Sequence, residues 1–327
     1  MSLSQMQVFN KYFMPATIET LAQMVEKFNA ASGGAIRLTT AGFEGDFMQE
    51  SFFAAIHSAQ RRVDRYATNE TQASTDLTQL KHSSVKIAGG FGPIRYEPSQ
   101  MTWLNKPTAE GVEVASRNFA EALLQDQLNT AILCLVTAVE NQATAKYDAS
   151  AVSPAEGISY KNINKAHAKF GDHSASLVAQ VMTGSVFHKL IGQNIVNSTR
   201  LFTAGNVNVV DILGKVVVVT DAPALYEAGS PTSYEKVLSL AEGAATVFDG
   251  GDVITNIETS NGKERIETTM QVDYTFGLSL KGYTWDEANG GKSPDDSDLA
   301  TADYWDKVAT NIKHTAGVLT IGDASVD

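Results

Sequence analysis

Two glycine-containing segments have the residue types found in phosphate-binding loops. Gly90-Phe91-Gly92 matches the start of a dinucleotide-binding fingerprint, and Gly291-Lys292-Ser293 matches the end of a P-loop. The first segment lacks the third glycine, and Pro93 interrupts the helix that would have to follow it. The second has Asp286 where a P-loop requires its first glycine, and acidic residues surround it. We therefore interpret the first segment as a turn and expect neither to bind a nucleotide.

The other ionisable side chains form no recognisable catalytic or metal site. No histidine lies three or four residues from another, as an HExxH zinc motif requires. Asp295-Asp296-Ser297-Asp298 lacks the ligand spacing, the central glycine and the terminal glutamate of an EF-hand loop. Cys134, the single cysteine, lies in an apolar run and is expected in the core. The sequence thus predicts no cofactor, no metal and no catalytic residue and favours a structural role, although a triad can assemble from distant residues.

The composition is that of an ordinary globular protein with an acidic balance. Of the 327 residues, 43% are hydrophobic and 19% are charged, and the net charge is −12. This charge argues against nucleic-acid binding as the main function, because such proteins need a basic face to displace counterions. The N-terminus lacks the basic segment and continuous apolar stretch of a signal peptide, and no window approaches the apolar length of a membrane span. We expect no membrane span. The cysteine usage fits a reducing cytoplasm, and it also fits a cysteine-poor protein elsewhere.

Helical periodicity dominates the N-terminal part of the chain. Apolar residues spaced three and four apart predict helices over 17–28 and 47–66. The aromatic residues of the second helix could lie in the core or on the face of an arm that packs on a neighbouring subunit. Arg61, Arg62 and Arg65, near its end, are interpreted as a solvated helix face.

The strongest helical pattern covers residues 107–145. Asn105 can cap this helix, and Pro107 suits its first turn. Unbroken, the helix would be about 58 Å long, whereas a compact globule of this chain length is only about 50 Å across. The sequence therefore predicts either a kinked helix or an elongated subunit with a helical spine.

Residues 71–98 are predicted to form a projecting hairpin. Two extended segments flank a glycine-rich tip at 88–93, and their apolar content is low for a hairpin packed inside a domain. Because a polar hairpin is marginally stable alone, we expect it to find support on another chain. The predicted subunit contacts in this hairpin are Lys81, Phe91, Ile94 and Tyr96.

The C-terminal half mixes helices with strands. The predicted elements are helices at 160–170, 174–193 and 304–312, and strands at 216–219, 253–259, 263–270, 272–280 and 317–321. Asn261-Gly262, the pair that type I′ turns prefer, predicts a hairpin between 253–259 and 263–270. Residues 286–306 hold seven acids and one base and are predicted to form an exposed acidic loop.

The order of these elements resembles that of tailed-bacteriophage major capsid proteins with the Hong Kong 97-type fold. The resemblance covers most of the chain and rests on short patterns. They are the 107–147 helix, the helix at 182–190 before Gly214-Lys215-Val216-Val217-Val218-Val219, Glu242-Gly243-Ala244, and Gly282-Tyr283-Thr284-Trp285. The resemblance implies an α+β fold with a long spine helix, an extended β-hairpin loop, a central mixed α/β axial domain and a β-rich peripheral domain.

The resemblance also implies a division of the chain and a function. The implied parts are an N-terminal helical arm (1–70), the extended hairpin loop (71–98), the spine helix of the peripheral domain (99–150), the axial domain (151–250), and peripheral strands with the acidic C-terminal region (251–327). Such a coat protein self-assembles into hexamers and pentamers of an icosahedral head around double-stranded DNA. It is assembled in the host cytoplasm and located in the virion capsid.

The implied partners are other copies of the chain, a scaffolding protein, a portal and a decoration protein, with only non-specific contact to the packaged DNA and no membrane. Some family members cross-link subunits through a hairpin lysine. Lys81 and Lys86 lie in the corresponding segment, but we interpret them as surface charges and predict no cross-link. Two alternatives stay open: an encapsulin-like compartment that packages enzymes, and an α+β enzyme with no recognisable motif.

Overall fold

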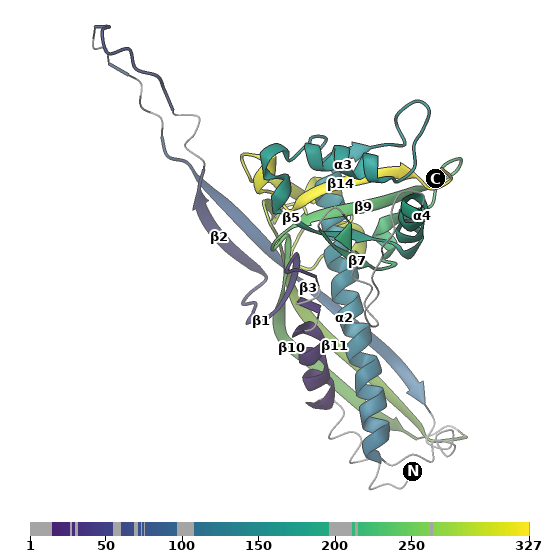
Figure 1. The fold of residues 1–327 in the computed structure, drawn as a ribbon. Coiled ribbons are helices and arrows are strands. Elements are labelled where there is room, and N and C mark those ends of the chain that lie inside the picture. Colours follow the sequence, from purple (N-terminus) through teal and green to yellow (C-terminus); the bar gives the residue numbers. More distant parts are fainter. Residues whose placement is uncertain are drawn as a thin grey trace.

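The subunit is elongated, and one long helix connects a lower sheet with an upper α/β layer (Figure 1). This computed structural model describes residues 15–26, 28–29, 32–54, 60–68, 71–72, 74, 76–96, 108–195, 211–212, 215–261 and 264–326.

Helix α2 (Thr108–Glu140) is the spine of the subunit and is about 50 Å long. It confirms the predicted spine helix, although it ends before residue 145. Ala131, Leu135 and Val139 are fully buried along one side of its C-terminal half, and Cys134 is buried beside them as expected. The elongated shape follows, because this helix is too long for a compact domain of this size.

The C-terminal part of α2 is more apolar than the sequence analysis expected. By length and composition alone, Ser116–Glu140 is apolar enough to cross a membrane, with a mean hydropathy of 1.4. In the structure, 56% of its most apolar window is buried inside the subunit. The apolar surface is used for packing against the two sheets.

The lower sheet, called sheet A, has the order β1-β10-β11-β3-β2. Its strands are β1 (Ile36–Gly42), β10 (Ala245–Ser260), β11 (Glu267–Leu280), β3 (Gln79–Tyr96) and β2 (Phe47–Phe53). All neighbours pair antiparallel except β1 and β10. Helix α2 covers one face of this sheet, where Tyr274 of β11 donates a hydrogen bond to Asp126 of the helix.

The structure contradicts part of the N-terminal prediction. Residues 15–26 form the first predicted helix, and Leu21 and Val25 pack against the main core. The predicted helix over 47–66 is wrong, because residues 47–53 form β2 and pair with β3. A short apolar run does not distinguish the periodicity of a helix from that of a strand. Aromatic residues favour a strand when a neighbouring strand is present to pair with it.

The glycine-rich tip predicted at 88–93 is also wrong. These residues lie inside β3, which continues for 18 residues and pairs with β11. Gly89 is there for close packing, because a Cβ atom on it would lie 2.8 Å from the ring of Tyr274. Residues 54–78 connect β2 to β3, and we call this connection the projecting loop, because its described residues 60–68 lie far from both sheets (Figure 1).

The upper sheet, called sheet B, has the order β4-β14-β9-β5-β7-β6, with β8 paired to β9. Its strands are β4 (Lys146–Asp148), β14 (Gly317–Asp323), β9 (Tyr234–Ala241), β5 (Leu177–Met182), β7 (Lys215–Val219), β6 (Asp211–Ile212) and β8 (Tyr226–Glu227). Helices α3 (Tyr160–Ala168) and α4 (Gly184–Ile195) pack on one face through Ile163, Val186 and Leu190. The other face packs on α2, so the spine helix contacts both sheets.

The predictions for this region are partly confirmed. Helix α3 and strand β7 lie at the predicted positions, and Ser159 caps α3 by accepting a hydrogen bond from the Asn162 amide. The helix predicted over 174–193 is wrong in its first half, because residues 177–182 form β5 and only 184–195 are helical. Strand β5 is central and buried on both faces. Its sequence therefore lacks the alternation of apolar and polar residues that would distinguish a strand from a helix.

In the C-terminal region the predicted hairpin is present, and the predicted last helix is not. Strands β10 and β11 form the hairpin, with β11 starting at residue 267 instead of 263. The helix predicted over 304–312 is wrong: Trp305 begins the short strand β13 (Trp305–Lys307), which pairs with β12 (Tyr283–Trp285). The predicted strand at 317–321 is confirmed as β14, yet it lies in sheet B and not with the peripheral strands of sheet A. The remaining short helices are η3 (Gly171–Ser176), η4 (Pro223–Leu225), α5 (Asp296–Leu299), η5 (Ala302–Tyr304) and η6 (Ile312–His314).

Two tryptophans anchor the acidic segment 286–306 to the rest of the subunit. The rings of Trp285 and Trp305 meet edge to face with centroids 4.9 Å apart, and both are almost fully buried. Of the acids of the segment, Asp295, Asp296, Asp303 and Asp306 are exposed as predicted, whereas Asp286, Glu287 and Asp298 are partly buried. The segment is therefore acidic outside and apolar inside.

Replacing Trp305 with alanine should lower the free energy of unfolding of the isolated subunit by about 3–5 kcal/mol, because it empties a packed site. Chemical denaturation followed by circular dichroism measures the change. Ile266→Ala is the control, because this side chain is 55% exposed and its loss should change stability by less than about 0.5 kcal/mol. Equal losses in the two variants would contradict the assigned packing.

His167 is a buried histidine in the last turn of α3. Its Nε2 lies 2.8 Å from the Ser239 hydroxyl of β9, and the residue is 6% exposed. Burial, and secondly the charge of Lys215, lower the pKa of His167 to about 4. The fold therefore holds this imidazole neutral at pH values where an unfolded chain would protonate it.

Stability should consequently fall as the pH decreases from about 6.5 toward 4, because in that window the unfolded state binds the proton that the folded state does not. The expected contribution is up to about 3 kcal/mol. His167→Gln should flatten this part of the curve of unfolding free energy against pH. His173→Gln, which changes an exposed histidine, should leave it unchanged. An unaltered slope in His167→Gln would contradict the assignment.

Candidate functional site

The four subunit contacts predicted from sequence all lie on β3, but their surroundings differ. Lys81 is half-exposed, and its Nζ lies 2.7 Å from the Glu287 carboxylate of the same subunit. Ile94 is 49% exposed on the sheet surface. The backbone of Tyr96 pairs with Thr268 of β11.

Phe91 has an intramolecular role that the sequence did not reveal. Its ring lies 5.2 Å from the ring of Phe119 on α2 and 5.6 Å from that of Tyr274 on β11. It is half-buried between the spine helix and sheet A. Strand β3 thus brings the four residues onto one element without collecting them into one exposed patch.

Among the described residues of the N-terminal half, the most exposed large apolar side chains lie on the projecting loop. Its described residues extend away from both sheets (Figure 1). Val63 is 65% exposed, and Tyr66 is 94% exposed. The Tyr66 amide donates a hydrogen bond to Asp64 Oδ1 at 2.9 Å, which forms a turn at this point. Exposed aromatic and apolar side chains on a projection are typical of a protein–protein contact.

Three arginines accompany these side chains at 61, 62 and 65, and all are exposed. Among the described residues, none of them forms an ion pair within the subunit. The predicted solvated helix face is wrong for these arginines, because residues 60–68 form no helix. The available signal was the combination of arginine with an aromatic residue, which is enriched where proteins bind one another.

A second group of exposed apolar residues lies at the opposite end of sheet A. Strand β10 pairs with β1 only over residues 245–249, and among the described residues no other strand pairs with 253–260 on that side. The exposed residues here are Val253 (42%), Ile254 (66%) and Ile266 (55%), together with Ile94 of β3. This end and the projecting loop are different surfaces on one chain, which suits head-to-tail contacts between copies.

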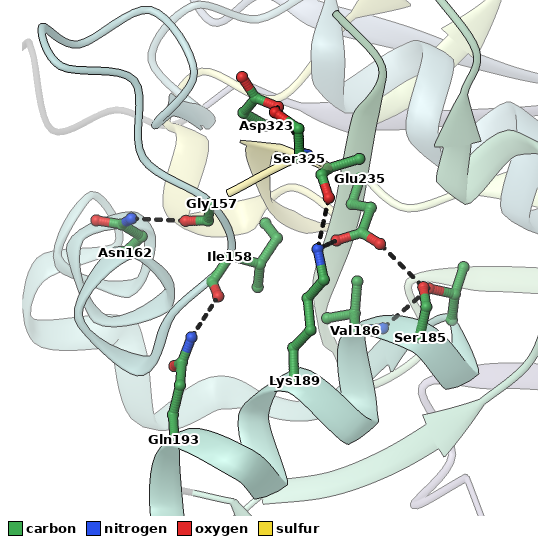
Figure 2. Close-up of polar contacts among 12 residues, drawn as sticks. Gly157, Ile158, Asn162, Ser185, Val186, Lys189, Gln193, Glu235, Asp323 and Ser325 are labelled. Atoms are coloured by element: carbon green, nitrogen blue, oxygen red, sulfur yellow. Dashed lines mark hydrogen bonds and ion pairs between the residues drawn. The ribbon is translucent and has the colours of Figure 1, made fainter. Parts of the chain in front are cut away.

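Polar contacts in the axial part fix its helices and the C-terminal strand (Figure 2). Lys189 of α4 donates hydrogen bonds to Glu235 Oε2 at 3.1 Å and to the Ala324 carbonyl at 2.7 Å. The Ser185 hydroxyl donates to the other Glu235 oxygen at 2.9 Å. The Lys189 and Glu235 side chains are largely buried, so the pair joins α4, β9 and the segment after β14 into one unit.

Two ion pairs that share the buried Lys236 join the end of the spine helix to sheet B. Lys236 of β9 lies 2.8 Å from Glu140 at the end of α2 and 2.9 Å from Glu227 of β8. Burial alone would lower the pKa of Lys236, but its hydrogen bonds to the two carboxylates outweigh burial and raise it. These two networks are suited to holding the spine helix, α4 and sheet B in fixed relative positions. Among the described residues, no group of three histidine, cysteine or acidic side chains is placed to hold a metal ion.

Comparison with known proteins identifies a family. A family model described as Gp13-like, "Major capsid protein 13-like", matches residues 5–319. No curated protein matches the chain. The match covers nearly the whole chain, so it includes both sheets, the spine helix and the projecting loop.

Solved phage structures, capsids among them, resemble this chain. The Cyanophage Pam1 capsid asymmetric unit has 12% sequence identity and a TM-score of 0.54, covering 89% of this chain and 89% of that chain. A Mycobacterium phage Adephagia structure has 10% identity and a TM-score of 0.49, covering 89% and 88%. The capsid of Helicobacter pylori bacteriophage KHP30 has 9% identity and a TM-score of 0.49, covering 88% and 87%.

The α+β architecture, with a spine helix shared by two sheets, confirms the Hong Kong 97-type fold expected from the sequence. With the family match over residues 5–319, the chain belongs to the Gp13-like family of major capsid proteins and is a coat protein of a bacteriophage capsid.

Proposed function

We propose that this coat protein assembles into hexamers and pentamers that close into an icosahedral head around double-stranded DNA. The observation that carries the proposal is the pair of separate exposed surfaces, the projecting loop and the open end of sheet A. Two different surfaces on one chain form heterologous contacts, and such contacts close into rings when the rotation between copies is a simple fraction of a turn.

The projecting loop is the main proposed contact between subunits. Its described residues pack little within their own subunit, so their apolar surface is removed from water only when another copy covers it. Lys81, Ile94 and Tyr96 on β3 are further proposed contacts, and Phe91 supports the strand from the inner side.

The remaining partners are proposed from the family. They are a scaffolding protein and a portal during assembly in the host cytoplasm, a decoration protein on the finished head, and DNA through non-specific contact. The net charge of −12 is consistent with weak contact to DNA, since like charges repel at the phosphate backbone. We also propose that the chain is not an enzyme, because its buried polar groups connect structural elements.

Deleting residues 60–68 and joining the ends with a short glycine–serine linker should block assembly and leave the subunit folded. The sheets and the spine helix do not depend on these residues, whereas the proposed contact does. Wild-type protein should form closed particles in negative-stain images, and the deletion variant should sediment as small oligomers with unchanged circular dichroism. Arg117→Ala, which changes an exposed residue of α2, is the control and should form particles. Normal particles from the deletion variant would contradict the proposed contact.

Particles purified from phage-producing cells should contain nuclease-protected double-stranded DNA. Nucleic-acid staining after nuclease treatment and mass spectrometry of the particle contents measure this. An enzyme cargo in place of DNA would show instead that the shell is an encapsulin-like compartment. A soluble monomer that never forms particles would contradict both shell functions.

A further inference from the structure

The projecting loop is joined to the subunit by a two-stranded ribbon, which consists of β2 and residues 79–84 of β3. The two strands run together toward the loop (Figure 1). Strand β11 pairs with β3 only over residues 85–96, so no residue of β11 pairs with the ribbon. No residue of β2 is buried, and the buried residues of β3 in this stretch are Ser83 and Ser84. Apolar packing is therefore sparse along the ribbon, and other contacts must fix its direction.

Glu287, in the acidic segment that follows β12, contacts both strands of the ribbon. Its Oε1 oxygen lies 2.7 Å from Lys81 Nζ and 2.8 Å from Gln49 Nε2. The Ser83 hydroxyl donates a hydrogen bond to the same oxygen, and the hydrogen bonds from Lys81 and then Ser83 hold the pKa of Glu287 below its usual value. Gln49 belongs to β2 and the other two donors belong to β3, so one charged carboxylate links the two strands to the segment.

Two further polar contacts attach β3 at the same place. The Ser83 amide donates a hydrogen bond to Thr284 Oγ1 at 2.8 Å, and His82 Nε2 lies 3.1 Å from the Leu280 carbonyl oxygen. Ser83 is only 2% exposed, so the loss of Glu287 would leave its hydroxyl buried without the acceptor that it has here. A buried donor without an acceptor is costly, whereas an exposed ion pair contributes little. The contact with Ser83 therefore makes Glu287 more than a surface charge.

The backbone that carries Glu287 is itself held in place. The Asp286 carboxylate accepts hydrogen bonds from the backbone amides of residues 288 and 289, at 2.9 and 3.2 Å, which form a turn. Trp285 Nε1 donates a hydrogen bond to the Gly291 carbonyl at 3.0 Å, and its ring belongs to the main core. Glu287 is therefore connected through this turn to the same core that holds the spine helix.

Glu287 differs from the other hydrogen-bonded acids of its segment in the partners that it contacts. Asp286 accepts hydrogen bonds from the turn that follows it, and two other acids form the capping box of α5. Glu287 instead contacts strands that are about 200 residues earlier in the sequence. A second, more exposed contact between the same two regions is the ion pair of Lys292 with Asp46, at 3.4 Å. The acidic segment thus reaches the base of the ribbon at two places, and Glu287 makes the closer contact.

We propose that Glu287 is a positioning residue for assembly, because it fixes the direction in which the ribbon and the projecting loop leave the subunit. The acidic segment 286–306 then has a structural role at the base of the loop. The effect on the ribbon follows from contacts within one subunit, whereas the effect on assembly rests on the proposed function. A closed shell requires every copy to present its contact surfaces at a reproducible angle. A ribbon without Glu287 would leave this angle variable.

Amide hydrogen exchange of the full-length chain, measured by mass spectrometry below the concentration at which particles form, tests the positioning role. Glu287→Ala should speed exchange at least tenfold over residues 47–53 and 79–84, because the ribbon opens more often. Exchange over the C-terminal half of α2 should not change. Asp306→Ala, which removes an exposed acid of the same segment, is the matched control and should leave both regions unchanged. A ribbon that exchanges at the wild-type rate in Glu287→Ala would overturn the proposal.

A charge exchange separates positioning from a general loss of stability. Lys81→Glu and Glu287→Lys should each speed exchange of the ribbon, because each places like charges next to each other. The double variant restores opposite charges and should recover at least part of the protection, since Ser83 and Gln49 can each present an oxygen to the new lysine. The measurement is made on unassembled subunits, so contacts of Lys81 with other copies do not contribute. No recovery in the double variant would contradict the assigned pair.

Particle formation measures the consequence for assembly. Glu287→Ala should lower the fraction of protein that sediments as closed particles at least tenfold, whereas Asp306→Ala should assemble normally. Glu287→Gln keeps an oxygen for the Ser83 hydroxyl, so it should fold and show a smaller loss, and it replaces the alanine variant if circular dichroism shows that variant unfolded. Faster ribbon exchange with a normal particle yield would overturn the role in assembly. Wild-type protein that forms no particles would instead overturn the proposed function and leave the exchange result unaffected.

Discussion

The packing of the second half of α2 between two sheets is the interaction on which the rest of the structure depends. Side chains from this one helix share a single continuous core with Val247 and Leu278 of sheet A and with Leu238 and Leu319 of sheet B. Without α2, the face of each sheet that packs on this helix would be exposed to solvent. The helix therefore fixes the position of the two sheets relative to each other and produces an extended plate in place of two independent domains.

Charge pairs stabilise the orientation that this packing sets. Glu140 lies at the C-terminal end of α2. The helix dipole is negative there, so an acidic side chain is unfavourable unless a cation compensates for its charge. Lys236 supplies that cation from the central strand of sheet B. The ion pair between Lys189 and Glu235 likewise holds α4 against sheet B and the segment after β14. A subunit built in this way keeps its shape, so its exposed surfaces stay at fixed positions for the contacts between copies.

The two functional surfaces arise from features that weaken the fold locally. The projecting loop exposes Tyr66 to water, and the far end of sheet A leaves Ile254 66% exposed. Each is unfavourable in an isolated subunit, because apolar surface stays in contact with water. The balance changes when copies associate and cover both surfaces. Assembly and subunit structure are thus coupled through the same apolar area.

Local patterns were sufficient for the elements that are long or that carry strong end signals. The spine helix followed from its periodicity, the β10–β11 hairpin from its turn residues, and β7 from its β-branched run. These elements also gave the fold class and the family resemblance. Their identity depends on neighbours in the sequence, which is why no structure was needed to recognise them.

The site required the tertiary structure. Strand β2 has an apolar spacing compatible with a helix, and β5 has no alternation because both of its faces are covered. Gly89 and Gly90 resemble a turn in the sequence, yet the ring of Tyr274 and the carboxylate of Asp273 require them inside a strand. The sequence by itself determined which segments prefer helix or strand and that the chain is a capsid subunit by resemblance. Only the tertiary structure decided which segment projects and which end of sheet A stays exposed, because both depend on pairing between residues that are distant in sequence and adjacent in space.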